Sequence, residues 1–347
     1  MWVLLAVNIV SIVCAYFAQV KKYEVCLLFS FVFIGLFLAF RYDFGNDYMA
    51  YFYMHQEIQS EIGLSSYYEK GWVLLNKIFS NFYILIFFLA IINSYIYFRF
   101  INRYVPEKMW WLAVFLYVFN TNFMLVQSST MRQTVAILIF IYSFKYILRG
   151  QLGIYLLCCF LAISFHISAI ILLPIYFCRY IKLKSFFSRL VIWALFLSMY
   201  IFGQYFLPMM KDAVLFFTGG RYTHFLDETS TNSLLNICVY VALLSIVLYV
   251  HGKTHNNIVR LFNIISIIAL FFFPIASFIP MVARLGYYFF PATLVTYTNV
   301  VKELSMSARY VFLLCLIFVI LIRFVTITNS EIWRDHFLIY KTIYSVL

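Results

Sequence analysis

The sequence predicts an all-α, polytopic integral membrane protein with about 12 transmembrane helices. Hydrophobic residues make up 65% of the chain and charged residues only 11%, whereas soluble domains are about one-quarter charged. Uncharged apolar runs recur along the whole length, as at residues 25–40 and 82–98. Each run approaches the roughly 20 residues that a helix needs to cross a bilayer. We therefore expect one transmembrane helical domain over residues 1–347.

The apolar runs predict spans at residues 2–20, 24–40, 82–100, 109–126, 132–148, 151–165, 167–180, 189–207, 234–251, 258–279, 284–301 and 309–328. The sixth and seventh are short and can form one bent unit. Helices are expected because lipid satisfies no backbone polar groups, and because the chain lacks the alternation of barrel strands. The first run has no basic n-region, so it is predicted to be a span and not a cleaved signal peptide.

The basic residues predict an orientation. With Lys21 and Lys22 inside, about fifteen of the 25 Lys and Arg residues fall in inside loops, the excess that the positive-inside rule expects. Both termini then face outward. The long connections, about 41–81 and 208–233, lie on the same outer side, and the amphipathic stretch 71–79 is expected in the membrane interface. Because long loops are often functional, we expect the working face outside.

Composition also argues against several classes of function. The net charge of +12 comes from residues scattered between spans, with no basic stripe to follow a phosphate backbone, so no nucleic-acid partner is expected. No Walker-type loop is present for nucleotide binding. The seven cysteines show no metal-ligand or disulfide spacing and are expected to act as small buried hydrophobes.

Polar side chains gather at the predicted outer ends of the spans. These candidate site residues are Arg41, Asp43, Asp47, Glu69, Arg132, Gln133, His166, Arg221 and Arg284. Several arginines from separate helices suggest an anionic substrate, because guanidinium groups bind phosphate in a bidentate manner and keep their charge when partly desolvated. Arg132 opens a span within the polar stretch QSSTMRQT, where an anion would be favoured at a helix start.

Each residue also has a purely structural explanation. An arginine at a span end can simply extend to lipid headgroups, and His166 can be a hydrogen-bonded core or interfacial histidine. Glu69 and Asp47 can be solvated loop acids. The stretch RYDFGNDY, residues 41–48, can be a solvated turn at Gly45 and Asn46 with an internal Arg–Asp pair.

The ordered motifs resemble a known family. R-x-D-x-G-x-D-Y after the second span, E-x-G about twenty residues later, R-Q at the start of a middle helix, and F-H-x-S-A together resemble the EpsG-like polysaccharide polymerases. That family belongs with the Wzy-type O-antigen and capsule polymerases. The resemblance covers roughly residues 35–300 and depends on the whole set, since none of these motifs is specific alone.

The resemblance implies a glycosyltransferase in the bacterial inner membrane, with its active site facing the periplasm or cell exterior. The enzyme would transfer a growing glycan from undecaprenyl diphosphate onto a lipid-linked repeat unit, without metal or cofactor. Its expected partners are the lipid-linked donor and acceptor, membrane lipids and a chain-length-regulating co-polymerase. The two aspartates of DFGND stand four residues apart and form no tight D-x-D pair, which gives weak support to a metal-free site.

Roles at the matching positions follow from this resemblance. Arg132, Arg221 and Arg284 would neutralise the donor diphosphate as negative charge develops on it. The acceptor hydroxyl benefits from a general base, for which His166 is the first choice because its ordinary pKa lies near neutrality.

Asp47 and Glu69 are the alternative bases. Arg41 would brace Asp43 or Asp47 within the loop, or contact substrate together with Asp43 and Gln133.

Two other classes remain as alternatives. A transporter or flippase of lipid-linked oligosaccharides predicts charges near the middle of several spans and repeated halves. Most charges here lie at span ends, with Arg323 as the main exception. A membrane O-acyltransferase of polysaccharide would also use a histidine, but it needs an acyl-CoA path from the cytoplasm, whereas His166 is predicted outside.

Overall fold

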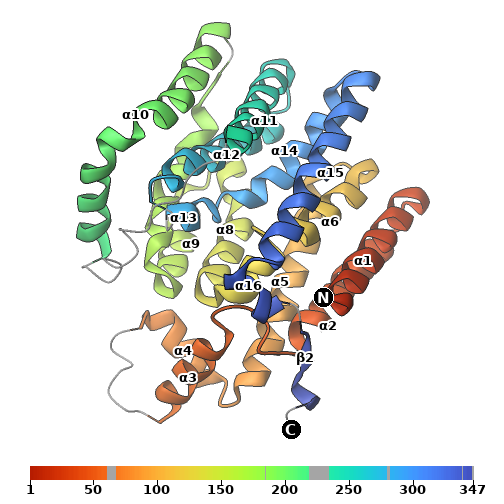
Figure 1. Ribbon diagram of the computed structural model, residues 1–347, viewed down its shortest axis with the longest axis vertical. Coiled ribbons are helices and arrows are strands. Elements are labelled where there is room, and N and C mark those ends of the chain that lie inside the picture. The colour runs from red at the N-terminus through yellow and green to blue at the C-terminus, as the bar shows by residue number, and fades with distance from the viewer. Residues whose placement is uncertain (61–67, 184, 219–233, 280–281, 338, 346–347) are drawn as a thin grey trace. The chain divides into compact units, whose positions relative to one another are not determined.

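The computed structural model describes residues 1–60, 68–183, 185–218, 234–279, 282–337 and 339–345 (Figure 1). Helices make up nearly all of its regular structure, with one two-stranded sheet among the described residues. The prediction of an all-α, polytopic membrane protein is confirmed.

Seven helices of the described chain are long and apolar enough to cross a membrane. They are α1 (Trp2–Lys21), α5 (Phe82–Tyr104), α8 (Met131–Arg149), α10 (Phe186–Thr218), α11 (Leu234–Lys253), α12 (Asn257–Ala276) and α15 (Met306–Thr328). Shorter apolar helices are α2 (Glu24–Ala39), α9 (Leu152–Phe165) and the 3₁₀ helix η3 (Ile167–Tyr180). These ten elements coincide with ten of the predicted spans.

The other two predicted spans are broken helices. The span at 109–126 consists of η2 (Glu107–Met109), α6 (Trp110–Phe119) and α7 (Met124–Ser129). Helix α6 ends at Phe119 because the backbone of Asn120 is extended. The span at 284–301 consists of α13 (Ala283–Gly286) and α14 (Phe290–Glu303). Pro291 stands in the first turn of α14, where its missing amide hydrogen and fixed φ favour a helix start.

The chain forms two compact units, residues 1–173 with 305–347 and residues 174–304. The first contains α1, α2, α5 and α6 packed on one another, together with the α8–α9 pair. It also holds α3 (Tyr48–Gln59) and α4 (Lys70–Ile78), which pair with each other within the predicted outer loop 41–81. The second contains α10 to α14, of which α12 packs against α14, α11 and α13. The expectation of a single domain stays a prediction.

The start of the predicted loop 208–233 differs from expectation. Helix α10 does not stop at residue 207 but continues through Pro208 to Thr218. A proline inside a helix removes one backbone hydrogen bond and bends the helix without necessarily ending it, and α10 is visibly bent in Figure 1.

The C-terminal segment packs against the loop that follows α2. Strand β1 (Arg41–Tyr42) pairs antiparallel with β2 (Lys341–Thr342), so that Arg41 lies opposite Thr342. Helix α16 (Glu331–Phe337) precedes β2, and the short η6 (Ile343–Ser345) follows it. Phe44 is fully buried between the rings of Phe37 and Phe337. The C-terminal segment is therefore part of the first unit's core.

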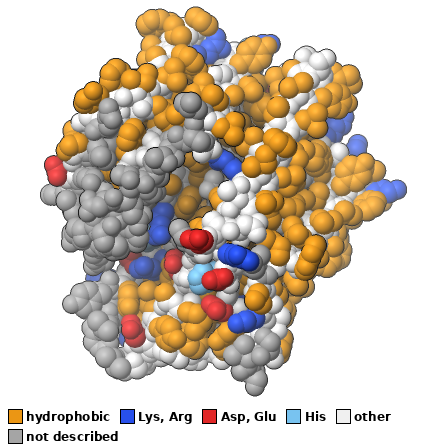
Figure 2. Space-filling view, in the orientation of Figure 1, with side chains coloured by type: hydrophobic (Ala, Val, Ile, Leu, Met, Phe, Trp, Pro, Cys, Tyr) orange, Lys and Arg blue, Asp and Glu red, His pale blue; other side chains and the backbone are white. Residues whose placement is uncertain are grey.

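Hydrophobic side chains cover most of the face shown in Figure 2. Large apolar residues are strongly exposed on several helices, among them Leu157 on α9 and Leu314 and Phe318 on α15. Apolar surface on this scale is typical of helices that face lipid. Charged side chains on this face gather where α16 lies in Figure 1.

Candidate functional site

Glu69, Arg132 and His166 form an ion-pair cluster in the first unit. Nη1 of Arg132 donates a hydrogen bond to Oε2 of Glu69 over 2.6 Å, and Nδ1 of His166 lies 3.5 Å from Oε1. The carboxylate is thus shared between a guanidinium and an imidazole. The exposed fractions of the side chains are 14% for Glu69, 21% for Arg132 and 19% for His166. The cluster is mostly desolvated but reachable from solvent.

Each member comes from the end of a different helix. Glu69 is the N-cap of α4, Arg132 lies in the first turn of α8, and His166 ends α9 in an extended conformation. A close approach between α4 and α9 brings these ends together. A Cβ added to Gly71 would lie 2.5 Å from Oγ and 2.8 Å from the carbonyl oxygen of Ser164. The glycine of the E-x-G motif therefore lets α4 pack directly on the backbone next to His166.

The environment of Glu69 favours its charged form. Burial alone disfavours the carboxylate, but the contact with His166 and the charge of Arg132 outweigh burial and lower the pKa of Glu69 to about 2. Glu69 is therefore ionised near neutral pH and would be a weak general base. The carboxylate is better suited to holding Arg132 and His166 in place beside each other.

Tyr51 completes the cluster, and no sequence motif indicated it. The backbone N–H of Arg132 donates to the Tyr51 hydroxyl over 3.4 Å, and the guanidinium carbon lies 5.9 Å from the centre of the tyrosine ring. Burial raises the pKa of Tyr51, against the lowering effect of Arg132. Nε of Arg132 has no hydrogen-bond partner among the described residues. The guanidinium thus keeps capacity to bind a further acceptor.

Helices α3 and α4 carry Tyr51 and Glu69 and are joined by buried polar contacts. Nδ1 of His55 lies 2.9 Å from Oδ1 of Asn76, and Gln59 donates to the Asn76 carbonyl over 2.6 Å. These bonds satisfy groups that would be costly to bury unpaired. The pair of helices therefore holds Tyr51 and Glu69 at a fixed spacing.

Arg41 is a buried arginine that has no acidic partner among the described residues. Its exposed fraction is 6%, and its Nε has no hydrogen-bond partner among the described residues. The Tyr48 hydroxyl donates to the Arg41 carbonyl over 3.2 Å, and the Tyr48 ring centre lies 5.9 Å from the guanidinium carbon. Burial lowers the pKa of Arg41 to about 10. Within the described part of the chain no ion pair joins Arg41 to Asp43 or Asp47, so the expected bracing of these aspartates is not seen.

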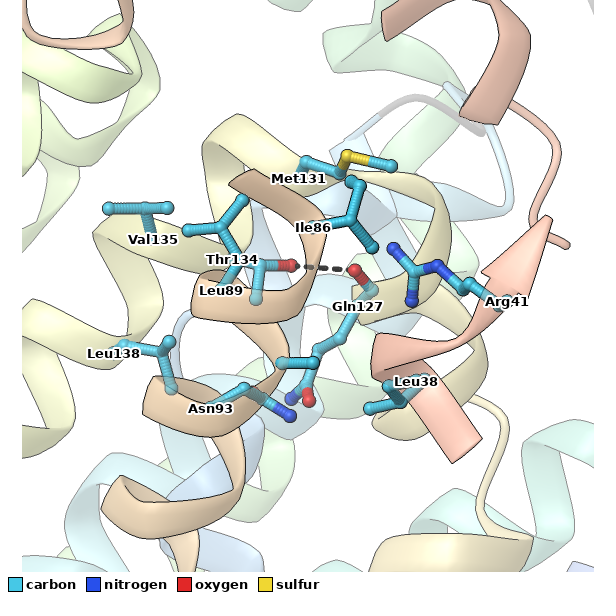
Figure 3. Close-up of a pocket in the computed structure, with 11 residues that line it drawn as sticks. Leu38, Arg41, Ile86, Leu89, Asn93, Gln127, Met131, Thr134, Val135 and Leu138 are labelled. Atoms are coloured by element: carbon cyan, nitrogen blue, oxygen red, sulfur yellow. Dashed lines mark hydrogen bonds between the residues drawn. The ribbon is translucent and has the colours of Figure 1, made fainter. Parts of the chain in front are cut away.

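The Arg41 side chain lines a small cavity of about 30 Å³ between α2, α5, α7 and α8 (Figure 3). Asn93, Gln127 and Thr134 supply its polar wall, and Thr134 donates to the Gln127 carbonyl over 3.2 Å. Leu138 and Val135 lie on the side away from Arg41. The volume is sufficient for a water-sized polar group, so the cavity presents an unpaired cation to a small acceptor.

The remainder of the RYDFGNDY loop is tightly held. Gly45 has a φ of +113°, and a Cβ there would lie 2.7 Å from the Ser128 carbonyl oxygen. The N–H of Asn46 donates to the Ser129 hydroxyl over 3.1 Å, and the N–H of Tyr48 donates to the Gly45 carbonyl. The expected turn at Gly45 and Asn46 is present, and it packs against α7 instead of standing free in water.

The other expected site residues lie elsewhere. Asp43 has a left-handed backbone, Asp47 is the N-cap of α3, and Gln133 is buried on α8. Arg284 is an exposed residue of α13 in the second unit. Arg221 lies outside the described residues. Within the described part of the chain, no three His, Cys, Asp or Glu side chains are grouped closely enough to hold a metal ion.

Comparison with known proteins gives one family. The family model described as the EpsG family matches residues 24–342, which is most of the chain. Its members are polysaccharide-polymerase-like membrane proteins. No curated protein and no solved structure matches the chain.

Proposed function

The chain belongs to the EpsG family, and from this premise we propose that it is a glycosyltransferase that polymerises a lipid-linked glycan. It would transfer the growing glycan from undecaprenyl diphosphate onto the terminal sugar of a lipid-linked repeat unit. The reaction would take place at the periplasmic or outer face of the bacterial inner membrane, without metal. A separate co-polymerase would regulate chain length.

The observation that carries this proposal is the Glu69 carboxylate held between Arg132 and His166. A carboxylate beside Nδ1 can position an imidazole, and it leaves Nε2 to act on substrate. A guanidinium beside the same group can bind the anionic leaving group. Base and anion site therefore lie within one cluster, as a displacement at a sugar–diphosphate carbon requires.

The proposed step is a direct displacement. The acceptor hydroxyl transfers its proton to Nε2 of His166 while its oxygen attacks C1 of the donor sugar. The bond between C1 and the diphosphate oxygen breaks, and the lipid diphosphate leaves with the electron pair. Arg132 would balance the charge that develops on this leaving group, because preorganised charge is most effective where solvent is excluded. Asp47 remains a reserve base, whereas Glu69 is better suited to orienting His166.

Arg41 would supply a second cation. Its guanidinium is buried, lacks a carboxylate partner among the described residues, and faces a cavity. Burying an unpaired charge is unfavourable, so retaining it is reasonable where a small polar group of the substrate provides the missing partner. The diphosphate-binding roles expected for Arg221 and Arg284 from the sequence remain proposals.

Reconstituted protein supplied with purified lipid-diphosphate repeat units tests the proposal. We expect one free lipid diphosphate to be released for each repeat unit added to the glycan, with equal yield in the presence of EDTA. Movement of intact repeat units across the bilayer without release of lipid diphosphate would instead establish a flippase. Transfer of acyl groups to the glycan would establish an acyltransferase.

A further inference from the structure

A second polar cavity lies within the unit formed by residues 174–304. Its volume is about 240 Å³, and it is lined by Lys182, Leu183, His251, Gly252, His255 and Arg260. Lys182 and Leu183 follow η3, and His251 and Gly252 lie at the C-terminal end of α11. His255 lies in the link between α11 and α12, and Arg260 lies in the first turn of α12. None of them belongs to the Glu69–Arg132–His166 cluster, so the cavity shares no residue with that cluster.

The lining is cationic. Lys182 and Arg260 carry positive charges, and none of the six lining residues is acidic. Arg189 adds a further guanidinium at the edge, because a Cβ on Gly252 would overlap Arg189 Nη1. Like charges gathered around a cavity repel one another, and a bound anion removes that repulsion. The composition of the wall therefore indicates an anionic ligand.

His251 gives a second, independent indication. Its exposed fraction is 3%, and its Nδ1 has no hydrogen-bond partner among the described residues. A buried ring nitrogen without a partner is unfavourable unless a ligand or water provides one. Since His251 lines the cavity, a ligand there can satisfy it.

Helix α12 reinforces the positive potential. Its N-terminus follows directly after His255, and the Asn256 side chain caps the amides of Ile258 and Val259. The positive end of the helix dipole is thus directed at the same region. Nε of Arg260 donates to the Thr254 carbonyl over 2.9 Å. This bond fixes the guanidinium beside the cavity.

We propose that this cavity binds a phosphate-bearing anion. Arginine and lysine provide charge-assisted donors for phosphate oxygens. A volume of about 240 Å³ accommodates a phosphate or diphosphate group. The phosphate belongs either to a soluble diphosphate or to an anionic phospholipid headgroup, for which basic pockets at the ends of membrane helices are suited.

Binding by the purified full-length chain tests this site. One arm titrates inorganic diphosphate by calorimetry in zwitterionic detergent, and the other measures retained phosphatidylglycerol by native mass spectrometry against phosphatidylcholine. Wild type is compared with Arg260→Gln and with Lys182→Gln. The exposed Lys182 can be changed with little risk to folding. Lys253→Gln is the matched control, because this exposed lysine of α11 contacts Tyr249 and does not line the cavity.

We expect the wild type to bind at least one of the two probes. Loss of a charge-assisted contact should weaken binding roughly ten-fold in the Lys182 and Arg260 variants and leave the Lys253 variant unchanged. Binding of diphosphate identifies a soluble ligand, whereas selective retention of phosphatidylglycerol alone identifies a headgroup. Failure of both probes to bind wild type overturns the proposal, and so does equal weakening in the Lys253 control.

Discussion

Nη1 of Arg132 and Oε2 of Glu69 are joined by a 2.6 Å hydrogen bond between residues that are 63 positions apart in the chain. The bond connects the start of α8 to the start of α4 and fixes the carboxylate beside His166. Its position between helix ends makes it both a structural link and the centre of the proposed catalytic machinery.

Glu69→Gln should lower both stability and activity. The amide keeps the size of the carboxylate but leaves the Arg132 charge uncompensated, which should reduce the free energy of unfolding by about 1–3 kcal/mol. Polymerisation should fall at least 100-fold, roughly the contribution of a positioned general base, because His166 loses its orienting partner. Chemical unfolding in detergent and product analysis check the two effects separately. Glu57→Gln, which alters the contact with the Tyr68 hydroxyl and leaves the Glu69 cluster intact, is the control.

The lowered pKa of Glu69 predicts that the stability of the fold depends on pH. The pKa of Glu69 in the folded chain is about 2, below its ordinary value of 4.5. Ionisation of Glu69 therefore stabilises the fold above about pH 4.5, and this contribution is lost as pH falls towards about 2. The difference in unfolding free energy between wild type and Glu69→Gln should shrink over that interval. A difference that stays constant from pH 6 to pH 2 would show that the charge of Glu69 is not the stabilising feature.

Gly71→Ala should separate α4 from α9. The new Cβ would meet the Ser164 backbone, which cannot move aside as a side-chain end can. We expect a destabilisation of about 1–3 kcal/mol from overpacking and a loss of activity, because Glu69 is only two residues away. Gly153→Ala on α9 is the matched control. Its Cβ would meet nothing within 4 Å, so it should be neutral or slightly stabilising.

Arg41→Met separates function from stability. If the guanidinium serves substrate, replacing it with an apolar side chain of similar length should leave the free energy of unfolding unchanged or raise it, since an unpaired buried charge is removed. Polymerisation should nevertheless be lost. Thermal unfolding and activity are measured on the same preparation. A strongly destabilised Arg41→Met variant would assign the residue a structural role instead.

The C-terminal segment should be required for the loop that carries Arg41. Tyr340 stacks on Phe37 with ring centres 4.4 Å apart, and its hydroxyl donates to the Phe37 carbonyl over 2.7 Å. Tyr340→Phe should cost about 1 kcal/mol for the lost hydrogen bond, and Tyr340→Ala should cost more because the ring contact is lost too. Ile339→Ala at an exposed neighbouring position should have little effect on unfolding. Equal effects of Tyr340→Ala and Ile339→Ala would contradict the assigned contact.

The sequence predicted the fold class well, because long uncharged runs leave few alternatives to membrane helices. Breaks inside apolar runs were not predicted. The interruption at Asn120 depends on packing and backbone conformation, and hydropathy does not report these. The helix through Pro208 was missed for the opposite reason, since a proline signals a break that the surrounding residues can override.

For the candidate site, the sequence identified Glu69, Arg132 and His166 but not how they contact one another. Because successive spans cross the membrane in opposite directions, the sequence predicts these helix ends on the same side of the membrane. The ion pair itself depends on the close packing of α4 on α9 at Gly71. Tyr51 is not part of any motif found in the sequence. The pairing of Arg41 with Thr342 joins segments about 300 residues apart. Such long-range contacts have no local signature in a single sequence.

The central claim is that Arg132 and His166 act in a metal-independent polymerase site. The most direct test is glycan chain length in vesicles containing wild type, Arg132→Gln, His166→Gln or Lys70→Gln, each supplied with the matching lipid-diphosphate repeat unit and EDTA. Lys70 is exposed and adjacent to Glu69, which makes it the matched control. We predict a ladder of lengthening glycans for wild type and Lys70→Gln, and none for the Arg132 and His166 variants in folded form. Absence of a ladder from folded wild type, or an intact ladder from Arg132→Gln, would contradict the account.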